Sequence, residues 1–312
     1  MIVEYPDYYD RFQCEAGDCP DTCCAGWEVD VDEETYYRYQ VVPGEFGDKL
    51  RSDIQDNDGE YSFVLTKDER CPFLDPDNLC DIYKQLGGDA LCQTCQEHPR
   101  FYTEIGEYEQ VDLSLSCPGV AKLFFESPRP FKVVRHEDDR PGTWLSVEDS
   151  ANLEEILAFR DSAMGGCQEG SSSKHFQHFF AADTDARWAA EFKGMEALEP
   201  SWSELTARIA ENYSDYQNDW PKVYNVAIER WFRKLGAYFS FRYYIDSWFD
   251  GSLVPEKKLI KKSLWFLRLM CIDRWRLNGG EFLKADLMDV VRQYSKEVEF
   301  SEENVKVLKE IQ

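Results

Sequence analysis

The sequence predicts a mainly α protein, in which a cysteine-rich, loop-rich metal-binding N-terminal module precedes a helical C-terminal region. Nine of the eleven cysteines lie between Cys14 and Cys117. The same part of the chain is rich in turn signals, such as Asp75-Pro76-Asp77-Asn78. From Ser146 onward, apolar residues recur at the spacing of amphipathic helices. Metal ligation commonly replaces an apolar core in modules built of short segments, so we expect the clustered cysteines to hold this module together.

The composition indicates a folded protein and excludes two classes of partner. Of the 312 residues, 43% are hydrophobic and 15% aromatic, unlike a disordered chain. The net charge is −25, whereas nucleic-acid binding needs a basic surface. The sequence contains no apolar run of about 18 residues, and its first residues lack the basic and apolar regions expected of a signal peptide. We therefore expect a cytoplasmic protein with no nucleic-acid or membrane partner, whose acidic surface attracts cationic partners.

Composition along the chain sets the expected domain boundaries. Residues 1–126 are predicted to form the cysteine-rich metal- or cluster-binding module, and residues 146–312 the helical region. Residues 127–145 contain several prolines and are predicted to connect the two. A short strand is expected within this connection, at residues 131–135.

The stretch Asp75-Pro76-Asp77-Asn78 is a turn between two cysteines. Proline presets φ, and the side chains of Asp and Asn bond to their own backbone. This turn is therefore expected to bring Cys71 and Cys80 together. A short helix is predicted next, because apolar residues recur at helical spacing over residues 79–86.

Capping residues, Gly and Pro divide the C-terminal region into helices. Ser201-Trp-Ser-Glu204 reads as a capping box, and Pro221 suits a first helical position. Gly251 is expected to end the helix that follows Pro221, and Ser301 to cap the last one. Gly and Ser residues around 165–173 predict a flexible loop. Helices are expected at residues 146–164, 183–198, from 201, 223–249, 256–277 and 281–298.

The cysteine spacing predicts a metal or cluster site. Thiolates bind zinc in fours, and iron–sulfur clusters also take four, so spacing alone leaves both open. Cys167 and Cys271 are isolated in helical contexts and are expected to be small buried apolar residues. The others occur as Cys14-x4-Cys19-x3-Cys23-Cys24, Cys71-x8-Cys80, Cys92-x2-Cys95 and Cys117.

These motifs resemble the flagellin lysine-N-methylase family and a related family of cysteine-rich zinc- or iron-chelating domains. The resemblance covers residues 14–118, about a third of the chain. Beyond the first four cysteines, it rests on Cys71-Pro-Phe-Leu-Asp75, Leu79-Cys80-Asp-Ile-Tyr83, Leu86-Gly87, Thr94-Cys95, Pro99-Arg100 and Leu115-Ser116-Cys117-Pro118. Cys92 and His98 depart from the family's usual pattern.

The resemblance implies an enzyme that transfers methyl groups from S-adenosylmethionine to lysine side chains of flagellin. It also implies a 4Fe–4S cluster, with zinc as the alternative metal. The residues that match the family's cysteines are Cys14, Cys19, Cys23, Cys24, Cys71, Cys80, Cys95 and Cys117. A second hypothesis is a non-catalytic zinc- or iron-chelating protein in which the metal only holds the fold. A third, a disulfide-linked secreted domain, requires export.

The sequence itself assigns no catalytic or methyl-donor-binding residue. It contains no Gly-x-Gly-x-x-Gly fingerprint after a strand and no Cys-x3-Cys-x2-Cys run. Polar residues near the cysteines, such as Asp75 and His98, are more often caps or ion-pair partners. His175 and His178 lack a third metal ligand nearby and favour a helix surface. The basic stretch 257–276 favours a helix on the core over one on a membrane surface.

Overall fold

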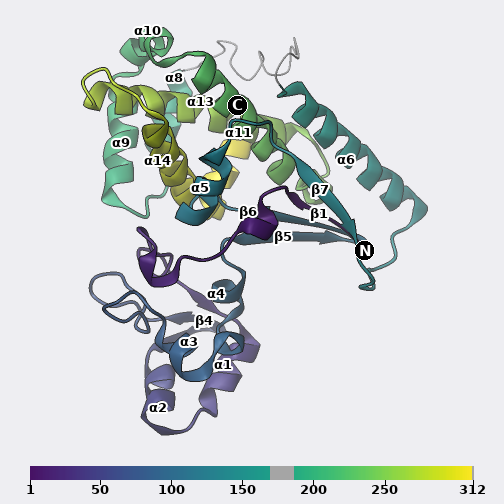
Figure 1. Ribbon diagram of the computed structural model, residues 1–312, viewed down its shortest axis with the longest axis vertical. Helices are drawn as coiled ribbons and strands as arrows, with labels where there is room; N and C mark the ends of the chain where they lie inside the picture. Colours follow the sequence, from purple (N-terminus) through teal and green to yellow (C-terminus); the bar gives the residue numbers. More distant parts are fainter. Residues whose placement is uncertain (169–185, 311–312) are drawn as a thin grey trace. The chain divides into compact units, whose positions relative to one another are not determined.

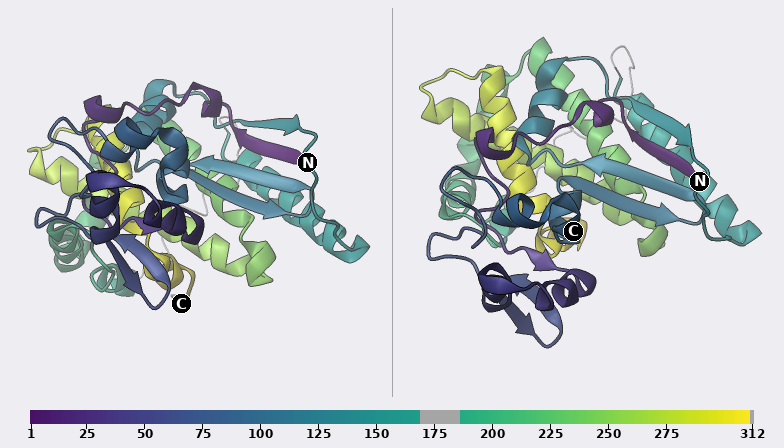
Figure 2. Two further views of the ribbon diagram at one scale, coloured as in Figure 1. Left: turned by 90° about the horizontal axis from the view of Figure 1, so that it is seen from below. Right: turned by 60° about the horizontal axis from the view of Figure 1, so that its bottom comes forward.

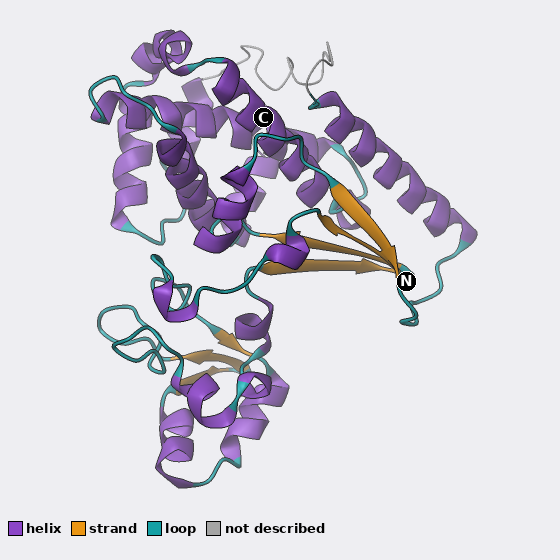
Figure 3. Cartoon of the chain, in the orientation of Figure 1, coloured by secondary structure: helices purple, strands orange, loops and turns teal. Residues whose placement is uncertain are grey.

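The computed structural model describes residues 1–168 and 186–310, which contain fourteen α-helices (Figures 1 and 3). The mainly α class is therefore confirmed. The chain forms two compact units, a cysteine unit (Gln13–Phe101 and Cys117–Gly119) and a large unit (Met1–Phe12, Tyr102–Ser116 and Val120–Gln312). The predicted domains, residues 1–126 and 146–312, stay predictions.

The cysteine unit combines a small antiparallel sheet with short helices. Its strands lie in the order β2 (Asp30–Val31), β4 (Glu60–Phe63), β3 (Ile54–Asn57). Its helices are α1 (Glu33–Gln40), α2 (Gly44–Ser52), α3 (Asp81–Leu86) and α4 (Gln93–Glu97). The helix expected at residues 79–86 is thus found as α3. The core is small and aromatic, and its most buried members are Tyr39, Leu50, Phe63 and Phe73.

The large unit contains a four-stranded sheet, of which the sequence predicted one strand. The order is β5 (Arg100–Ile105), β6 (Tyr108–Leu113), β1 (Ile2–Pro6), β7 (Val133–Glu137). Both views in Figure 2 show β1 beside β7, with β5 and β6 following. Strand β1 runs parallel to β6 and antiparallel to β7. The strand predicted at residues 131–135 corresponds to β7, shifted by two residues.

Helices form the rest of the large unit. Helix α13 contacts α9, α10, α11, α14 and α15, and α6 packs along α11. The helices are α5 (Pro118–Glu126), α6 (Val147–Gly166), α8 (Ala186–Phe192), α9 (Pro200–Glu211), α10 (Tyr213–Val223), α11 (Val226–Tyr244), α12 (Ser247–Asp250), α13 (Val254–Leu277), α14 (Lys284–Tyr294) and α15 (Glu302–Glu310). A π-helical turn, η4 (Ser295–Glu299), follows α14.

Two predicted helix starts are wrong. Helix α9 begins at Pro200, with Glu199 as its N-cap, so Ser201 lies inside the helix and forms no capping box. Pro221 lies near the end of α10 instead of opening the next helix. The start of α11 is set by Asn225, whose side chain accepts hydrogen bonds from two backbone N–H groups. Each signal was genuine helix chemistry, but a proline one turn from a boundary suits the end of one helix or the start of the next.

Other predicted boundaries agree with the structure. Gly251 follows α12 with a φ of 65°, a conformation that favours glycine, and the Ser301 hydroxyl accepts from the backbone N–H of Asn304. Helix α6 continues through the first glycines of the predicted loop at 165–173. Residues 169–173 of that loop, together with His175 and His178, lie outside the described residues. Within the described ranges, no helix has the length and apolarity needed to cross a bilayer.

Candidate functional site

Backbone pairing places two of the predicted metal ligands side by side in the cysteine unit. The backbone N–H of Cys71 donates to the carbonyl oxygen of Cys24 at 2.8 Å. The neighbouring residues Ala25 and Arg70 form an isolated antiparallel bridge. Cys24 and Cys71, which are 47 positions apart in the chain, are therefore fixed together by main-chain hydrogen bonds.

The turn after Cys71 adds a third cysteine. One carboxylate oxygen of Asp75 accepts two backbone N–H groups of the turn, each at 2.8 Å. This Asx-type geometry folds the chain back, so that Leu74 pairs with Cys80 in a second isolated bridge. The expected convergence of Cys71 and Cys80 is confirmed.

Five cysteines share one apolar core. Cys71 and Cys92 belong to the core itself and are 8% and 1% exposed. The other three are half-buried against it: Cys24, Cys80 and Cys95. Cys92, which the family resemblance left out of the predicted ligands, is thus the most buried thiol of the set.

The adjacent thiols of Cys23 and Cys24 share a hydrogen bond. The Cys23 thiol stabilises the Cys24 thiolate, which lowers the pKa of Cys24 to about 7. The pKa of Cys23 is raised by the same hydrogen bond, by burial and by the nearby thiols of Cys24, Cys14 and Cys117. A thiol that ionises near neutral pH is a competent metal ligand.

A second thiol pair lies at the start of α4. Cys92 is the N-cap residue of this helix and Cys95 lies in its first turn. The Cys95 thiol lowers the pKa of Cys92 by hydrogen bonding to it, and the pKa of Cys95 is raised in return. Burial raises the pKa of Cys71 to about 12. A positive charge is therefore needed to keep all of these thiols ionised together.

The remaining predicted ligands lie outside this core. Cys14 is exposed, and Cys19, Cys23 and Cys117 are half-buried. They are close enough to interact, since the charge of Cys14 contributes to raising the pKa of both Cys19 and Cys23. The nine clustered cysteines thus fall into a core set of five and an outer set of four, joined at Cys23-Cys24.

The donor chemistry of the core set fits a thiolate-ligated metal or cluster. All eleven cysteines are free thiols, so the described chain contains no disulfide. Among residues 1–168 and 186–310, no three His, Cys, Asp or Glu side chains are arranged to hold a single metal ion. The ligand set predicted from the sequence, Cys14, Cys19, Cys23, Cys24, Cys71, Cys80, Cys95 and Cys117, stays a prediction. Cys167 and Cys271 are buried in the large unit, as expected for isolated cysteines.

The large unit contains a buried polar cluster that the sequence did not indicate. It comprises Tyr8, Asp112, Ser114, Tyr238, Arg242, Tyr243, Ser295 and Glu299, which we call the acid–tyrosine cluster. Tyr8 and Asp112 lie near the carboxyl ends of β1 and β6, two adjacent parallel strands. Asp112 is the second-last residue of β6, and Tyr8 follows the end of β1 by two residues. The carboxyl ends of parallel strands meet at one edge of a sheet, which is where α/β sheets commonly bind ligands.

Glu299 anchors the cluster. One of its carboxylate oxygens accepts from the hydroxyls of Tyr238, at 3.1 Å, and Ser295, at 3.0 Å. Ser295 Oγ lies 3.1 Å from Ser114 Oγ, which links η4 to the segment after β6. Arg242 Nε lies 3.5 Å from the same carboxylate oxygen of Glu299. Arg242 therefore neutralises part of the negative charge on Glu299.

Four buried oxygens of the cluster form no hydrogen bond within the described chain: Asp112 Oδ2, Glu299 Oε1, Tyr8 Oη and Tyr243 Oη. Arg242 Nη1 lies 3.7 Å from Asp112 Oδ2, an ion-pair distance. Asp112 and Tyr8 are each 1% exposed and Glu299 is 6% exposed. Buried polar atoms without partners are costly and uncommon in proteins, so they require a functional or solvent explanation.

Burial governs the ionisation of both carboxyl groups. It raises the pKa of Asp112 to about 7, although Arg242 acts in the opposite direction. Burial also raises the pKa of Glu299, with Arg242 and the two hydroxyl donors opposing it. The cluster therefore holds a carboxyl group that exchanges its proton near neutral pH.

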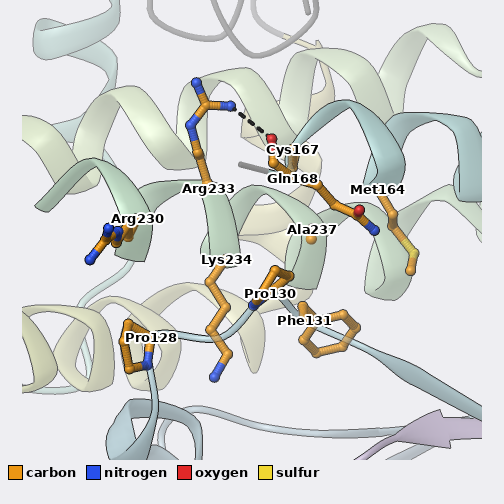
Figure 4. Close-up of a pocket in the computed structure, with 10 residues that line it drawn as sticks. All are labelled: Pro128, Pro130, Phe131, Met164, Cys167, Gln168, Arg230, Arg233, Lys234 and Ala237. Carbon is orange, nitrogen blue, oxygen red and sulfur yellow. Dashed lines mark hydrogen bonds between the residues drawn. The ribbon is translucent and has the colours of Figure 1, made fainter. Parts of the chain in front are cut away.

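A small pocket of the large unit lies beside a buried lysine (Figure 4). The ammonium of Lys234 points away from Arg233 and donates to the backbone carbonyl oxygens of Phe124, at 2.6 Å, and Ser127, at 3.0 Å. Burial lowers the pKa of Lys234 to about 8. Because both carbonyl contacts are within the protein, Lys234 has a structural explanation, unlike the carboxylates of the acid–tyrosine cluster.

Sequence reasoning missed the acid–tyrosine cluster because its members come from four distant segments. Asp112 and Glu299 are 187 positions apart and carry no local motif. Asp112 lies in a strand that also carries Glu109 and Gln110, and Glu299 lies in a turn with Lys296 and Glu297, so neither stands out in the sequence. Only the folded chain shows that both carboxylates are buried.

Comparison with known proteins assigns the C-terminal half of the chain to a protein family. Residues 147–312 match the family described as FliB lysine N-methylase C-terminal domain. The chain is 30% identical over 134 residues to the protein named Lysine-N-methylase of Salmonella typhimurium, and 29% identical over 134 residues to that of Salmonella choleraesuis. It is 30% identical over 142 residues to the Flagellar biosynthetic protein FliU of Salmonella muenchen.

These matches cover different shares of the relatives. Each covers 41% of this chain. The matched part is 33% of each lysine-N-methylase and 79% of FliU. The chain thus spans about a third of the length of the two lysine-N-methylases that it matches. No solved structure matches the chain. Five members of the acid–tyrosine cluster lie within the matched family region, namely Tyr238, Arg242, Tyr243, Ser295 and Glu299.

Proposed function

Because the chain belongs to the FliB lysine N-methylase family, we propose that it transfers methyl groups from S-adenosylmethionine to lysine side chains of flagellin in the cytoplasm. The match of residues 147–312 to this family is the observation that carries the proposal. The names of its relatives, Lysine-N-methylase and Flagellar biosynthetic protein, support both the reaction and a flagellar substrate.

The cysteine unit is proposed to hold a 4Fe–4S cluster. The donors are taken from the predicted set, and Cys24, Cys71, Cys80 and Cys95 have the support of a shared core. When bound, such a cluster supplies folding free energy to a unit whose own apolar core is small. The protein's part is to bring together thiols that are distant in the chain and to shield them from water.

The chemistry of the reaction sets what the protein must provide. A lysine ε-ammonium has no lone pair, so it must lose a proton before its nitrogen attacks the methyl carbon of a sulfonium. The protein must then align the amine, the methyl group and the sulfur. The net charge of −25 supports this function, because it attracts the lysine-bearing face of a protein substrate.

A direct assay tests the proposal. Anaerobically purified protein is incubated with flagellin and S-adenosylmethionine, and methylation of individual lysines is measured by peptide mass spectrometry. We expect mono- or higher methylation that requires both the protein and the methyl donor. If flagellin stays unmodified while the protein is folded and loaded with iron and sulfide, the proposed activity is wrong.

The alternative is a zinc- or iron-chelating protein in which the metal is structural. The observation that favours it is that five cysteines pack into the core of a unit built from short elements. Metal and sulfide analysis distinguishes the two. About four irons and four sulfides per chain, with visible absorption, support a 4Fe–4S cluster. A colourless protein with stoichiometric zinc supports the structural alternative.

A matched pair of variants ties the metal to the cysteine unit. Cys80→Ala removes a thiol of the core set, whereas Cys271→Ala removes a buried thiol of α13 in the large unit. We expect Cys80→Ala to lose most of its iron and Cys271→Ala to keep it. Equal iron contents in the two variants would remove Cys80 from the ligand set.

A further inference from the structure

The acid–tyrosine cluster has more negative charge and more acceptor capacity than its neighbours satisfy. Asp112 and Glu299 contribute two carboxylates, and among residues 1–168 and 186–310 Arg242 is the one cation within ion-pair distance of both. One oxygen of each carboxylate accepts no hydrogen bond from the part of the chain that the structure describes. A site of this kind is completed by a proton, by water or by a cation that donates hydrogen bonds.

The surrounding side chains indicate which of these three, a proton, water or a cation, completes the site. Tyr8, Tyr238 and Tyr243 contribute aromatic rings, and Tyr8 packs edge-on against Phe124 and Phe131. Aromatic faces and carboxylates together favour an organic cation with an apolar stem. The π-helical turn η4 supplies two of the polar groups, and such turns frequently occur at functional sites.

We propose that the acid–tyrosine cluster is the site that receives the ε-ammonium of the substrate lysine and that the Asp112–Glu299 pair accepts its proton. The inference rests on the proposed lysine methylation, and it adds the residues that bind and deprotonate the substrate. Nothing in the sequence motifs or in the relatives' names assigns this role.

The proposed steps balance as follows. The ammonium nitrogen gives one proton to a carboxylate oxygen and becomes a neutral amine. Its lone pair forms a bond to the methyl carbon of a sulfonium donor of the S-adenosylmethionine class. The carbon–sulfur bond breaks, and its electron pair stays on sulfur, which leaves as a thioether. The product is a methylated ammonium, and the carboxyl group returns its proton to solvent.

The protein's residues divide this work. The apolar surroundings disfavour charge and therefore favour the neutral amine. Arg242 stabilises the ionised form of the pair, so that one carboxylate is available as the base at neutral pH. The cluster is closed to solvent in this structure, so the proposal requires a movement that lets the substrate lysine enter. Tyr8 lies in the irregular segment between β1 and η1 (Tyr9–Arg11), and we place the movement there.

Ionisable groups from every neighbouring element affect this pair. Those from the N-terminal segment, β6, α11, α14 and η4 are Asp7, Tyr8, Asp112, Tyr238, Arg242, Tyr243, Tyr294 and Glu299. The tyrosines stay protonated, because burial raises the pKa of each far above neutral pH. Asp112, whose pKa burial raises to about 7, is therefore the group of this set that titrates near neutrality.

Isosteric variants test the proposal. Asp112→Asn and Glu299→Gln keep the shape of the side chains and remove the base. We expect kcat for flagellin methylation to fall by roughly 100-fold or more, the usual contribution of a general base. Affinity for S-adenosylmethionine is expected to stay within about threefold, and the inflection of the wild-type pH–rate profile near neutrality to disappear.

Asp273→Asn is the matched control. Asp273 is also buried, at 3% exposed, but its oxygens accept from Arg208 and Tyr216. This variant is expected to keep kcat within about threefold. If Asp112→Asn and Asp273→Asn affect kcat equally, and thermal unfolding shows both to be folded, the cluster is a structural feature and the inference is overturned.

A binding experiment separates this inference from the proposed function. The probe is 1-butylammonium, which has the stem and head group of lysine, and its binding is followed by saturation-transfer NMR. We expect wild-type protein and Asp273→Asn to bind it, and Asp112→Asn and Glu299→Gln to bind at least tenfold more weakly. If the protein binds butylammonium but does not methylate flagellin, the proposed substrate is wrong and the ammonium site stands. If the protein methylates flagellin and neither cluster variant changes the rate, the proposed activity stands and the ammonium site is wrong. If the protein neither binds butylammonium nor methylates flagellin, both proposals are overturned.

Discussion

Single buried residues of this protein titrate far from their usual range, and Lys234 shows how such a shift affects stability. Lys234 is 7% exposed, and its ammonium donates to two backbone carbonyl oxygens. It also lies 4.5 Å from the centre of the Phe124 ring. Burial lowers the pKa of Lys234 to about 8, because the charged form has lost its hydration.

We predict that the stability of wild-type protein relative to Lys234→Met increases between about pH 8 and pH 10.5. In this range the folded protein releases the proton of Lys234, whereas the unfolded chain keeps it up to a pKa of about 10.4. Folding is therefore linked to proton release, and the gain reaches about 3 kcal/mol at about 1.4 kcal/mol per pKa unit. Urea unfolding at pH 7.5 and pH 10 measures it. Lys193→Met, at an exposed lysine, is the control, and an unchanged difference between wild type and Lys234→Met would contradict the assignment.

At the scale of elements, helix boundaries depend on caps and close approaches. The N-terminus of α11 is capped by Asn225, whose Oδ1 accepts from the backbone N–H of Ala227, at 2.9 Å, and Ile228, at 3.0 Å. Helix α11 also carries Tyr238, Arg242 and Tyr243 of the acid–tyrosine cluster. Its first turn is therefore connected to the candidate site through one continuous helix.

We predict that Asn225→Ala lowers the free energy of unfolding by about 1 kcal/mol, because two N–H groups lose their acceptor. Asn225→Asp keeps the acceptor and is expected to cost less. Both are measured by urea unfolding at pH 7. A loss of equal size in the two variants would mean that Asn225 acts by something other than capping.

A close backbone approach fixes the turn before α2. A Cβ atom at Gly47 would lie 1.9 Å from the carbonyl oxygen of Val42, far inside contact distance. The same oxygen accepts a hydrogen bond from Arg51 Nη1 at 2.9 Å, so it is not free to move. Glycine at this position is therefore a requirement of the link between α1 and α2.

We predict that Gly47→Ala destabilises the protein by at least about 2 kcal/mol, as overpacking of a rigid contact does. The matched control is Gly165→Ala in α6, where a Cβ meets nothing within 4 Å. That change is expected to be neutral or stabilising by up to about 1 kcal/mol, because alanine favours a helix. Urea unfolding of Gly47→Ala and Gly165→Ala tests this prediction. Similar unfolding midpoints for the two variants would refute the proposed steric conflict.

At the scale of the whole molecule, the chain is divided into two compact units of different construction. The large unit has an extensive apolar and aromatic core, whereas the cysteine unit has a small core to which five cysteines contribute. If the thiols hold a cluster, the stability of the cysteine unit depends on it.

We predict that removal of iron by a chelator abolishes hydrogen-exchange protection across residues 13–101 and leaves α11 and α13 protected. Mass-spectrometric exchange before and after chelation measures both regions in one sample. Cys80→Ala should mimic the treated protein and Cys271→Ala the untreated one. Uniform loss of protection along the chain, or no loss at all, would show that the two units do not differ in this way.

The sequence by itself determined the mainly α class, the cysteine-rich N-terminal part, most helices and the turn that joins Cys71 to Cys80. It did so because turn chemistry, capping and helical periodicity are local. It indicated the family through cysteine motifs whose spacing can be read directly from the sequence. It misplaced Ser201 and Pro221, since a cap or proline near a boundary suits either neighbouring helix.

Only the tertiary structure decided what depends on contacts between distant segments. Strand β1 pairs with β6 across more than 100 residues, and no local pattern specifies that register. Cys92 joined the cysteine core because of what surrounds it, not because of its spacing. Asp112 and Glu299 became a candidate proton-accepting pair only when four segments buried them beside Arg242. Burial and charge neighbours set the chemistry of a carboxyl group, and both are properties of the folded chain.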